Sequence, residues 1–213
     1  MSQNQIKLLA TLLMCIDHLG FILGLEPLRA VGRLSFPLFC WVFGRNWQRE
    51  KSTEKAHNLM GRLMLFGCIS QIPYIILFNR LELNILFSFL LSTETFYLIR
   101  KTNKKILILS IGMLTAQILN TSYGWYAILC PLMLMGFNHK NSKIWWTIWI
   151  LINIMYSFTV GYITQLLAVA APLILLYHNP AKNRKPTTIE KKFFYYFYPI
   201  HLAGLAAIRA IIL

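Results

Sequence analysis

The chain has 213 residues, of which 57% are hydrophobic and only 13% charged, and its formal net charge is +14. A soluble domain carries about 25% charged and about 45–50% apolar residues, so this composition excludes a disordered, collagenous or ordinary water-soluble protein. The apolar residues form runs of about 15–20 residues separated by short polar clusters, which is typical of bilayer-spanning helices. The sequence therefore predicts an all-α protein, a polytopic transmembrane helical bundle.

Taken in chain order, the apolar runs predict about nine spans joined by short loops. The runs lie at 6–24, 28–46, 59–78, 83–99, 105–120, 123–137, 144–158, 162–178 and 193–213. The first run has no small-residue cleavage site after it, so we expect it to be a retained span. Since no soluble segment, internal repeat or long linker separates the runs, we expect residues 1–213 to form a single integral-membrane domain.

The basic residues alternate between the two sides of this layout. All but four of the 21 lie on the side where the chain begins, whereas the opposite loops hold only Arg29 and Arg80. The positive-inside rule then predicts a cytoplasmic N-terminus and, with nine spans, an external C-terminus. Because topology accounts for the positive charge, we expect no nucleic acid among the partners.

Four ionisable side chains interrupt apolar runs, where a charge is expensive and indicates a functional site. Asp17 and His18 lie in the first predicted span, Arg33 in the second and His201 in the last. At about 1.5 Å per helical residue, these positions fall at similar depths, in the outer-to-middle part of the bilayer. The sequence therefore allows a single polar pocket that contains all four.

The pairing of these four residues has two interpretations. Asp17 and Arg33 lie at similar height on neighbouring spans. In the first interpretation, their ion pair holds the two helices together and has no other role. Two histidines at compatible depth favour a functional site, since one ion pair does not require them. Adjacent side chains on a helix diverge by about 100°, so we expect Asp17 to pair with Arg33 or His201 and to leave His18 facing the cavity.

Weaker signals come from three further polar residues inside the runs. Gln71 and Asn84 are expected either to form interhelical hydrogen bonds or, together with Tyr198, to line a substrate pocket. Walker A, HExxH, CxxC and GxSxG motifs are missing from the sequence. ATPase, metalloprotease and thioredoxin-like chemistry therefore have no support, and no metal is expected.

Several segments, taken together and in order, carry a resemblance to a known family. They are KLLATLLMCIDHLG, GRLSFPLFCWVFG, GRLMLFGCISQIPY, NILFSF, TSYGWYAILCPLML and FYPIHLAGLAAI. The order of Asp-His, Gly-Arg-x-x-Phe-Pro-Leu-Phe and a late Phe-Tyr-x-x-His resembles the TraX family, the F-type conjugative pilin acetylases. That family belongs to the wider integral-membrane acyltransferase group, so the resemblance implies an acyltransferase-like domain.

The resemblance implies a multi-pass enzyme of the bacterial inner membrane. It would move an acetyl group from acetyl-CoA, its co-substrate, to the N-terminal amine of a pilin subunit. Acetyl-CoA is cytoplasmic, whereas the cleaved N-terminus of a membrane-inserted pilin faces outside. A pocket within the lipid bilayer that is reached from both sides would bring donor and acceptor together.

The residues suit that chemistry. Attack on a thioester needs a neutral amine, and a histidine is a suitable base near the α-amino pKa of about 7.7–8.0. We expect His18 or His201 to be this base and Asp17 to orient a histidine or Arg33. Arg33 is expected either to stabilise the oxyanion or to hold Asp17 without touching substrate.

The cytoplasmic arginines have two interpretations. Arg45, Arg49 and Arg62 are expected to attract the CoA phosphates, or to act only as topology determinants.

Other functional classes remain open from the sequence. Buried Asp, His and Arg residues also form proton relays, so a proton-coupled small-molecule transporter is the main alternative. An acyltransferase that modifies a sugar or another acceptor is a second. A non-enzymatic factor that chaperones a pilin is a third, and it would need the helices but not the histidines.

Overall fold

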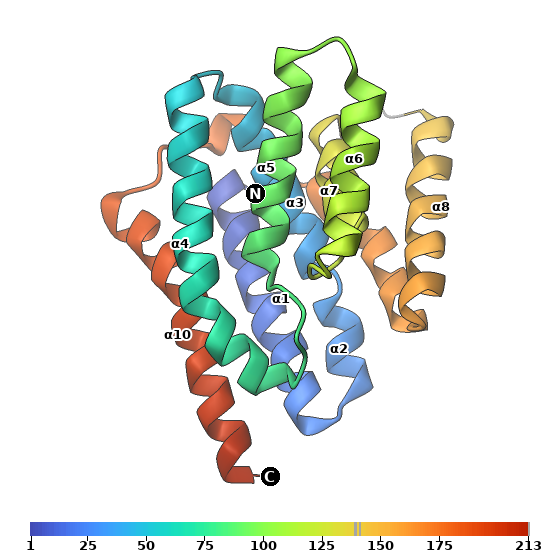
Figure 1. Ribbon diagram of the computed structural model, residues 1–213. Helices are drawn as coiled ribbons and strands as arrows, with labels where there is room; N and C mark the ends of the chain where they lie inside the picture. The colour runs from blue at the N-terminus through green and yellow to red at the C-terminus, as the bar shows by residue number, and fades with distance from the viewer. Residues whose placement is uncertain (139, 141, 213) are drawn as a thin grey trace. The chain divides into compact units, whose positions relative to one another are not determined.

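The structure, a computed structural model, describes residues 1–138, 140 and 142–212. In these ranges the chain consists of helices and loops, with one isolated β-bridge between Leu83 and Thr121, so the predicted all-α class is confirmed. The α-helices in chain order (Figure 1) are α1 (Gln3–Leu23), α2 (Glu26–Gly32), α3 (Ser35–Arg49), α4 (Thr53–Phe78), α5 (Ile85–Lys101), α6 (Lys105–Ile118), α7 (Tyr126–Met135), α8 (Lys143–Val160), α9 (Ala171–Leu175) and α10 (Thr188–Ile212). Two 3₁₀ segments, η1 (Ile163–Ala170) and η2 (Pro180–Lys182), lie on either side of α9.

Three of these helices are long and apolar enough to cross a membrane. They are α1, α4 and α8, and shorter apolar helices occur at Lys105–Ile118, Tyr126–Met135 and Ile163–Leu175. Most of the predicted apolar runs coincide with a helix, and the three long apolar helices are consistent with a membrane protein. The number of spans and the cytoplasmic N-terminus stay predictions.

The chain divides into two compact units, each built from separate stretches of sequence. The first unit comprises residues 1–48 and 130–185, and the second comprises residues 49–129 and 186–213. The first unit therefore contains α1, α2, most of α3, α8, η1 and α9. The second contains α4, α5, α6 and α10, and the boundary at residues 129 and 130 falls within α7.

In the first unit, α1 and α2 pack against each other as a helical hairpin. Ser2 and Gln5 form a reciprocal capping box at the start of α1, which satisfies two of the unpaired N–H groups of its first turn. Gly24 ends the helix in the left-handed conformation, with a φ of 64° that a residue with a side chain adopts reluctantly. The chain can therefore reverse within a few residues.

The second predicted span, 28–46, differs from the structure because it is divided into two helices. Helix α2 ends at Gly32, and α3 begins at Ser35. Pro37 then lies in the first turn of α3, where its missing N–H costs no helical hydrogen bond. Arg33 thus lies at a break between helices rather than within one.

The eighth predicted span, 162–178, is also not one regular helix. It consists of the 3₁₀ segment η1 followed by the short helix α9. Pro172 lies at the start of α9, and in a continuous α-helix its ring would remove a backbone hydrogen bond.

The beginning of α1 is tied to the far end of the first unit. The Gln3 side chain donates to Asn46 Oδ1 at 2.7 Å, and the Gln3 backbone N–H donates to Asn183 Oδ1 at 2.7 Å. The Asn179 N–H donates to the Met1 carbonyl at 2.9 Å. Segments more than 170 residues apart in the sequence are therefore joined by hydrogen bonds.

In the second unit, α4 packs against α5 and α10, and α5 packs against α6. The loop before α5 and the loop after α6 are joined by two backbone hydrogen bonds. Leu83 donates to the Asn120 carbonyl at 3.0 Å, and Ser122 donates to the Leu83 carbonyl at 2.7 Å. These bonds hold the residues that flank Leu83 next to the 119–125 loop.

Candidate functional site

Three charged side chains meet between α1 and α2 in the first unit. Asp17 lies on α1, with its Oδ2 3.9 Å from Arg33 Nη1 and its Oδ1 4.0 Å from Arg29 Nε. The side chains are largely buried, with exposed fractions of 15% for Asp17, 16% for Arg29 and 12% for Arg33. The predicted Asp17–Arg33 pair is confirmed, and a second arginine joins it.

Close packing of the two helices brings these charges together. A Cβ built on Gly32 would lie 2.3 Å from Asp17 Cβ and 2.6 Å from Asp17 Cα. A Cβ on Gly20 would lie 2.8 Å from Leu28 Cβ. Only glycine fits at these two positions, so the backbone of each helix approaches the other at the level of the ion pairs.

Arg29 is the member of this group that the sequence analysis missed, because it was assigned to a loop. It lies on α2, and its guanidinium also faces the ring of Phe21 at 5.2 Å and that of Tyr162 at 6.0 Å. The signal in the sequence was weak: a seven-residue helix that begins with Glu26 and Pro27 has no apolar run of its own.

His18 is partly buried on α1, one residue after Asp17. The two ion pairs of Asp17 involve Arg29 and Arg33, and the expectation that Asp17 and His18 do not form a dyad stays a prediction. No finding tests a catalytic role for His18, which stays a prediction.

His201 lies on α10 in the second unit, where its ring orientation is well defined. Its Nδ1 is 2.8 Å from the Tyr198 carbonyl and 3.2 Å from the Phe197 carbonyl, and the ring stacks on Phe197 at 4.9 Å. A carbonyl only accepts, so Nδ1 carries the hydrogen in the neutral ring and Nε2 carries the lone pair. This tautomer presents Nε2 as a potential base.

Gln71 and Asn84 contact each other in the second unit. Asn84 is fully buried, and its Nδ2 donates to Gln71 Oε1 and to the Gly67 carbonyl, each at 2.8 Å. Gln71 Nε2 donates to the Glu82 carbonyl at 2.8 Å, while Asn84 Oδ1 caps α5 by accepting from the Leu86 N–H. These bonds join α4 to α5, as the interhelical interpretation predicted, and a role in a substrate pocket is not tested.

A polar cluster that the sequence analysis missed lies next to these residues. Tyr74 donates a hydrogen bond to Glu82 Oε1, and the Ser122 side chain lies near the same tyrosine hydroxyl. The buried Tyr198 hydroxyl lies near the Ile85 backbone and interacts electrostatically with Glu82 and Tyr123. We call Tyr74, Glu82, Ser122, Tyr123 and Tyr198 the Glu82 cluster. The available sequence signal was Glu82 itself, one of only seven acidic residues.

The three arginines considered for CoA phosphates have different surroundings. Arg45 is partly buried in the first unit, with its guanidinium 6.0 Å from the Trp41 ring. Arg49 and Arg62 are exposed in the second unit, and Arg62 lies 5.5 Å from the Tyr195 ring. Among the described residues, no group of His, Cys, Asp or Glu side chains could hold a metal ion.

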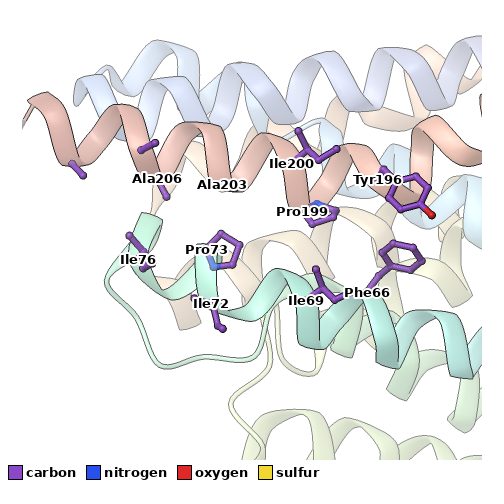
Figure 2. A pocket seen from close by; sticks show the side chains of 12 residues that line it. Phe66, Ile69, Ile72, Pro73, Ile76, Tyr196, Pro199, Ile200, Ala203 and Ala206 are labelled. Atoms are coloured by element: carbon purple, nitrogen blue, oxygen red, sulfur yellow. The ribbon is translucent and has the colours of Figure 1, made fainter.

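An apolar groove of about 720 Å³ runs between α4 and α10 in the second unit (Figure 2). Ile69, Ile72 and Pro73 line one side, and Pro199, Ile200 and Ala203 line the other. Apart from Tyr196, the lining side chains lack polar atoms, so this groove has no group for acid–base chemistry.

The four proposed catalytic residues are distributed over both units. Asp17, His18 and Arg33 belong to the first, and His201 belongs to the second with Gln71, Asn84 and Tyr198. The single pocket that would join them all stays a prediction.

Comparison with known proteins shows a family match over nearly the whole chain. The TraX protein family matches residues 2–209. The chain is similar to Protein TraX of Escherichia coli, with 36% identity over 92 residues, which cover 42% of this chain and 36% of that protein. No solved structure matches this chain.

Two further relatives differ in how much of their length is matched. The probable fimbrial assembly protein FimC, serogroup H1, of Dichelobacter nodosus is 25% identical, over 98% of this chain and 96% of that protein. The uncharacterized protein RP591 of Rickettsia prowazekii (strain Madrid E) is 29% identical over 149 residues, 66% of this chain. The match spans 57% of the Rickettsia protein, little more than half its length.

Proposed function

Because the chain belongs to the TraX family, we propose that it is a multi-pass acetyltransferase of the bacterial inner membrane. It transfers an acetyl group from acetyl-CoA to the N-terminal amine of a pilin subunit. Support for an assembly-related acceptor comes from the similar proteins, one of which is named as a probable fimbrial assembly protein.

The observation that carries this proposal is the buried charged group in which Asp17 of α1 faces two guanidinium groups, those of Arg29 and Arg33. Glu26 in the first turn of α2 also acts electrostatically on Asp17, so the surroundings contain two carboxylates and two guanidinium groups. A single structural ion pair would need only one arginine. A guanidinium group in a site of low dielectric constant stabilises the oxyanion that forms when an amine attacks a thioester.

The reaction balances with one base and one leaving group. The amine nitrogen forms a bond to the acetyl carbon, the carbon–sulfur bond breaks, and CoA leaves as the thiolate. The base takes one proton from the attacking nitrogen. CoA thiolate then accepts a proton when it is released.

His201 is the better-supported candidate for this base. Its Nδ1 is held by the Tyr198 carbonyl, so Nε2 presents a lone pair without any reorientation of the ring. His18 is the second candidate, because it is adjacent in sequence to the buried ion pairs. The CoA phosphates are expected near the cytoplasmic arginines Arg45, Arg49 and Arg62.

The proposal is tested by mass spectrometry of a cognate pilin that is co-expressed with this protein. We expect one acetyl group on the pilin N-terminus with the wild type, and a loss of at least about 100-fold in the His201→Gln variant. His18→Gln is measured in parallel to identify the base. His57→Gln is the matched control, because His57 is exposed and its ring centroid lies 5.3 Å from that of Tyr97, away from the proposed catalytic residues in the sequence.

Each variant is first checked for expression and membrane insertion. An unmodified pilin in the presence of folded wild-type protein would refute pilin acetylation. Full activity in both the His18 and His201 variants would refute histidine base catalysis.

A further inference from the structure

The Glu82 carboxylate lies outside the ion pairs found among the described residues. The hydrogen bond that it accepts from a side chain comes from the Tyr74 hydroxyl. Arg80, two residues earlier, is exposed, and Arg209 of α10 donates to the Leu77 carbonyl. A partly buried acidic side chain therefore has a tyrosine as its hydrogen-bond donor, in a chain with a net charge of +14.

Removing a carboxylate from water costs free energy unless a cation or several donors compensate it. The Tyr74 hydroxyl supplies one donor, whereas an ionised carboxylate has about four lone-pair positions. Besides Ser122, the cluster consists of three tyrosines, of which Tyr74 donates to Glu82 and Tyr198 interacts with it electrostatically. A carboxylate beside aromatic rings is a suitable environment for an alkylammonium group.

The backbone around Glu82 is held in place by the β-bridge and by Gln71. The Leu83–Thr121 bridge joins the two loops of the cluster, and Gln71 of α4 donates to the Glu82 carbonyl at 2.8 Å. Gln71 Oε1 also accepts from the Asn84 N–H at 3.0 Å. The carboxylate is thus preorganised, which reduces the cost of binding a ligand.

The Glu82 cluster is also connected to His201. Tyr198 interacts with Glu82 through its hydroxyl and accepts a hydrogen bond from His201 through its backbone carbonyl. One residue of α10 therefore links the carboxylate to the candidate base, within the same unit.

We propose that the Glu82 cluster is the subsite that binds the primary ammonium group of the acceptor. This inference rests on the proposed function, because it identifies where the amine substrate is recognised before acetylation. The bound ammonium releases one proton to solvent before the neutral amine attacks, and acetylation then gives a neutral amide. The same carboxylate therefore favours the substrate over the product and promotes product release.

The test is a binding measurement without acetyl donor, on the full chain in lipid nanodiscs. The probe is a synthetic peptide with the first residues of the mature cognate pilin, compared with the same peptide acetylated at its N-terminus. We expect wild type to bind the free peptide about tenfold tighter, which corresponds to about 1.4 kcal/mol. In Glu82→Gln this preference should disappear, and in Glu82→Asp it should largely return.

Two control variants separate charge recognition from structural support. Tyr74→Phe removes the hydrogen bond to Glu82 but keeps the carboxylate, so the preference for the free peptide should persist. Glu94→Gln removes an exposed carboxylate elsewhere in the second unit and should also leave the preference unchanged.

A further measurement needs no variant. The affinity of wild type for the free peptide should fall as the pH rises through the α-amino pKa of about 7.7–8.0, whereas the affinity for the acetylated peptide should stay constant. Equal binding of both peptides by wild type, or an unchanged preference in Glu82→Gln, would overturn the ammonium subsite. Selective binding without acetyl transfer would instead refute the proposed reaction and leave the subsite in place.

Discussion

The close approach of α1 and α2 makes Gly32→Ala the most informative single substitution in the first unit. The added methyl group would lie 2.3 Å from Asp17 Cβ, and ordinary van der Waals contact begins at 3.4 Å. The neighbouring atoms are backbone and Cβ atoms, which cannot rotate away. We therefore expect the two helices to separate by about 1 Å at this level.

The magnitude follows from that separation. Overpacking of this kind costs about 1–3 kcal/mol. The Asp17–Arg33 distance would lengthen from 3.9 Å to about 5 Å, which weakens a pair in an effective dielectric constant of about 20 by about 1 kcal/mol. Replacing a glycine inside a helix with alanine raises the stability by about 0.5–1 kcal/mol. The net expected loss of stability is about 2–3 kcal/mol, or about 5–10 °C in the unfolding midpoint.

The assay is thermal unfolding of purified protein in nanodiscs, monitored by tryptophan fluorescence. Gly61→Ala and Gly204→Ala are matched controls, because an added Cβ at either position meets nothing within 4 Å. Both should be neutral or slightly stabilising. A Gly32→Ala protein as stable as these controls would refute the close helix approach and the tight setting of the ion pairs.

Three more substitutions test separate parts of the structure. Asn84→Ala removes the buried amide that joins α4 to α5 and caps α5. The free energy of unfolding, measured in graded SDS, should therefore fall by about 2–4 kcal/mol, and a fall of less than about 0.5 kcal/mol would contradict this role. Arg29→Gln leaves Asp17 with one ion-pair partner and should lower the acetylation rate about tenfold, whereas Arg29→Lys should keep most of the wild-type rate. Equal acetylation rates in Arg29→Gln and Arg29→Lys would contradict a role for the positive charge. A hydrogen bond from Lys55 lowers the pKa of the Glu50 carboxyl, so carboxyl NMR should show this pKa rising in Lys55→Met. Because the folded-state pKa is lowered, the Glu50 contribution to stability is present at neutral pH and is lost as the pH falls through that pKa. Lys55→Met should weaken this dependence, while the backbone hydrogen bond from Ser52 keeps part of it.

The helices could be predicted from the sequence because apolar runs and capping residues are local signals. Ser2 and Gly24 mark the two ends of α1, and the rarity of charges in apolar runs made Asp17 and Arg33 conspicuous. The pairing of these two residues followed from the hairpin between neighbouring helices. The breaks at Arg33 and before α9 were not predicted, because they depend on helix packing and on proline positions within otherwise continuous apolar runs.

The Glu82 cluster could not be derived in the same way. Glu82 and Ser122 are brought together by a β-bridge between loops, and Tyr198, which interacts with Glu82, lies on a helix more than 100 residues after it. Neither loop has a periodic pattern that would reveal this pairing. Similarly, the sequence left two roles open for Gln71, whereas the structure uses both ends of its amide in hydrogen bonds to the segment at residues 82–84.

The hydrogen bond between Gln3 and Asn183 has a consequence for biosynthesis. The helices at the start of the chain belong to a unit that is completed only after residues 49–129 have been made. At a synthesis rate of about 5–20 residues per second, the interval between translation of Gln48 and of Asn183 is on the order of ten seconds. During this interval the nascent α1 lacks its hydrogen bond to Asn183, while residues 49–129 of the second unit are synthesised. Ribosome-bound chains that stop before Asn183 should leave the first residues open to proteolysis, and chains extended beyond it should protect them.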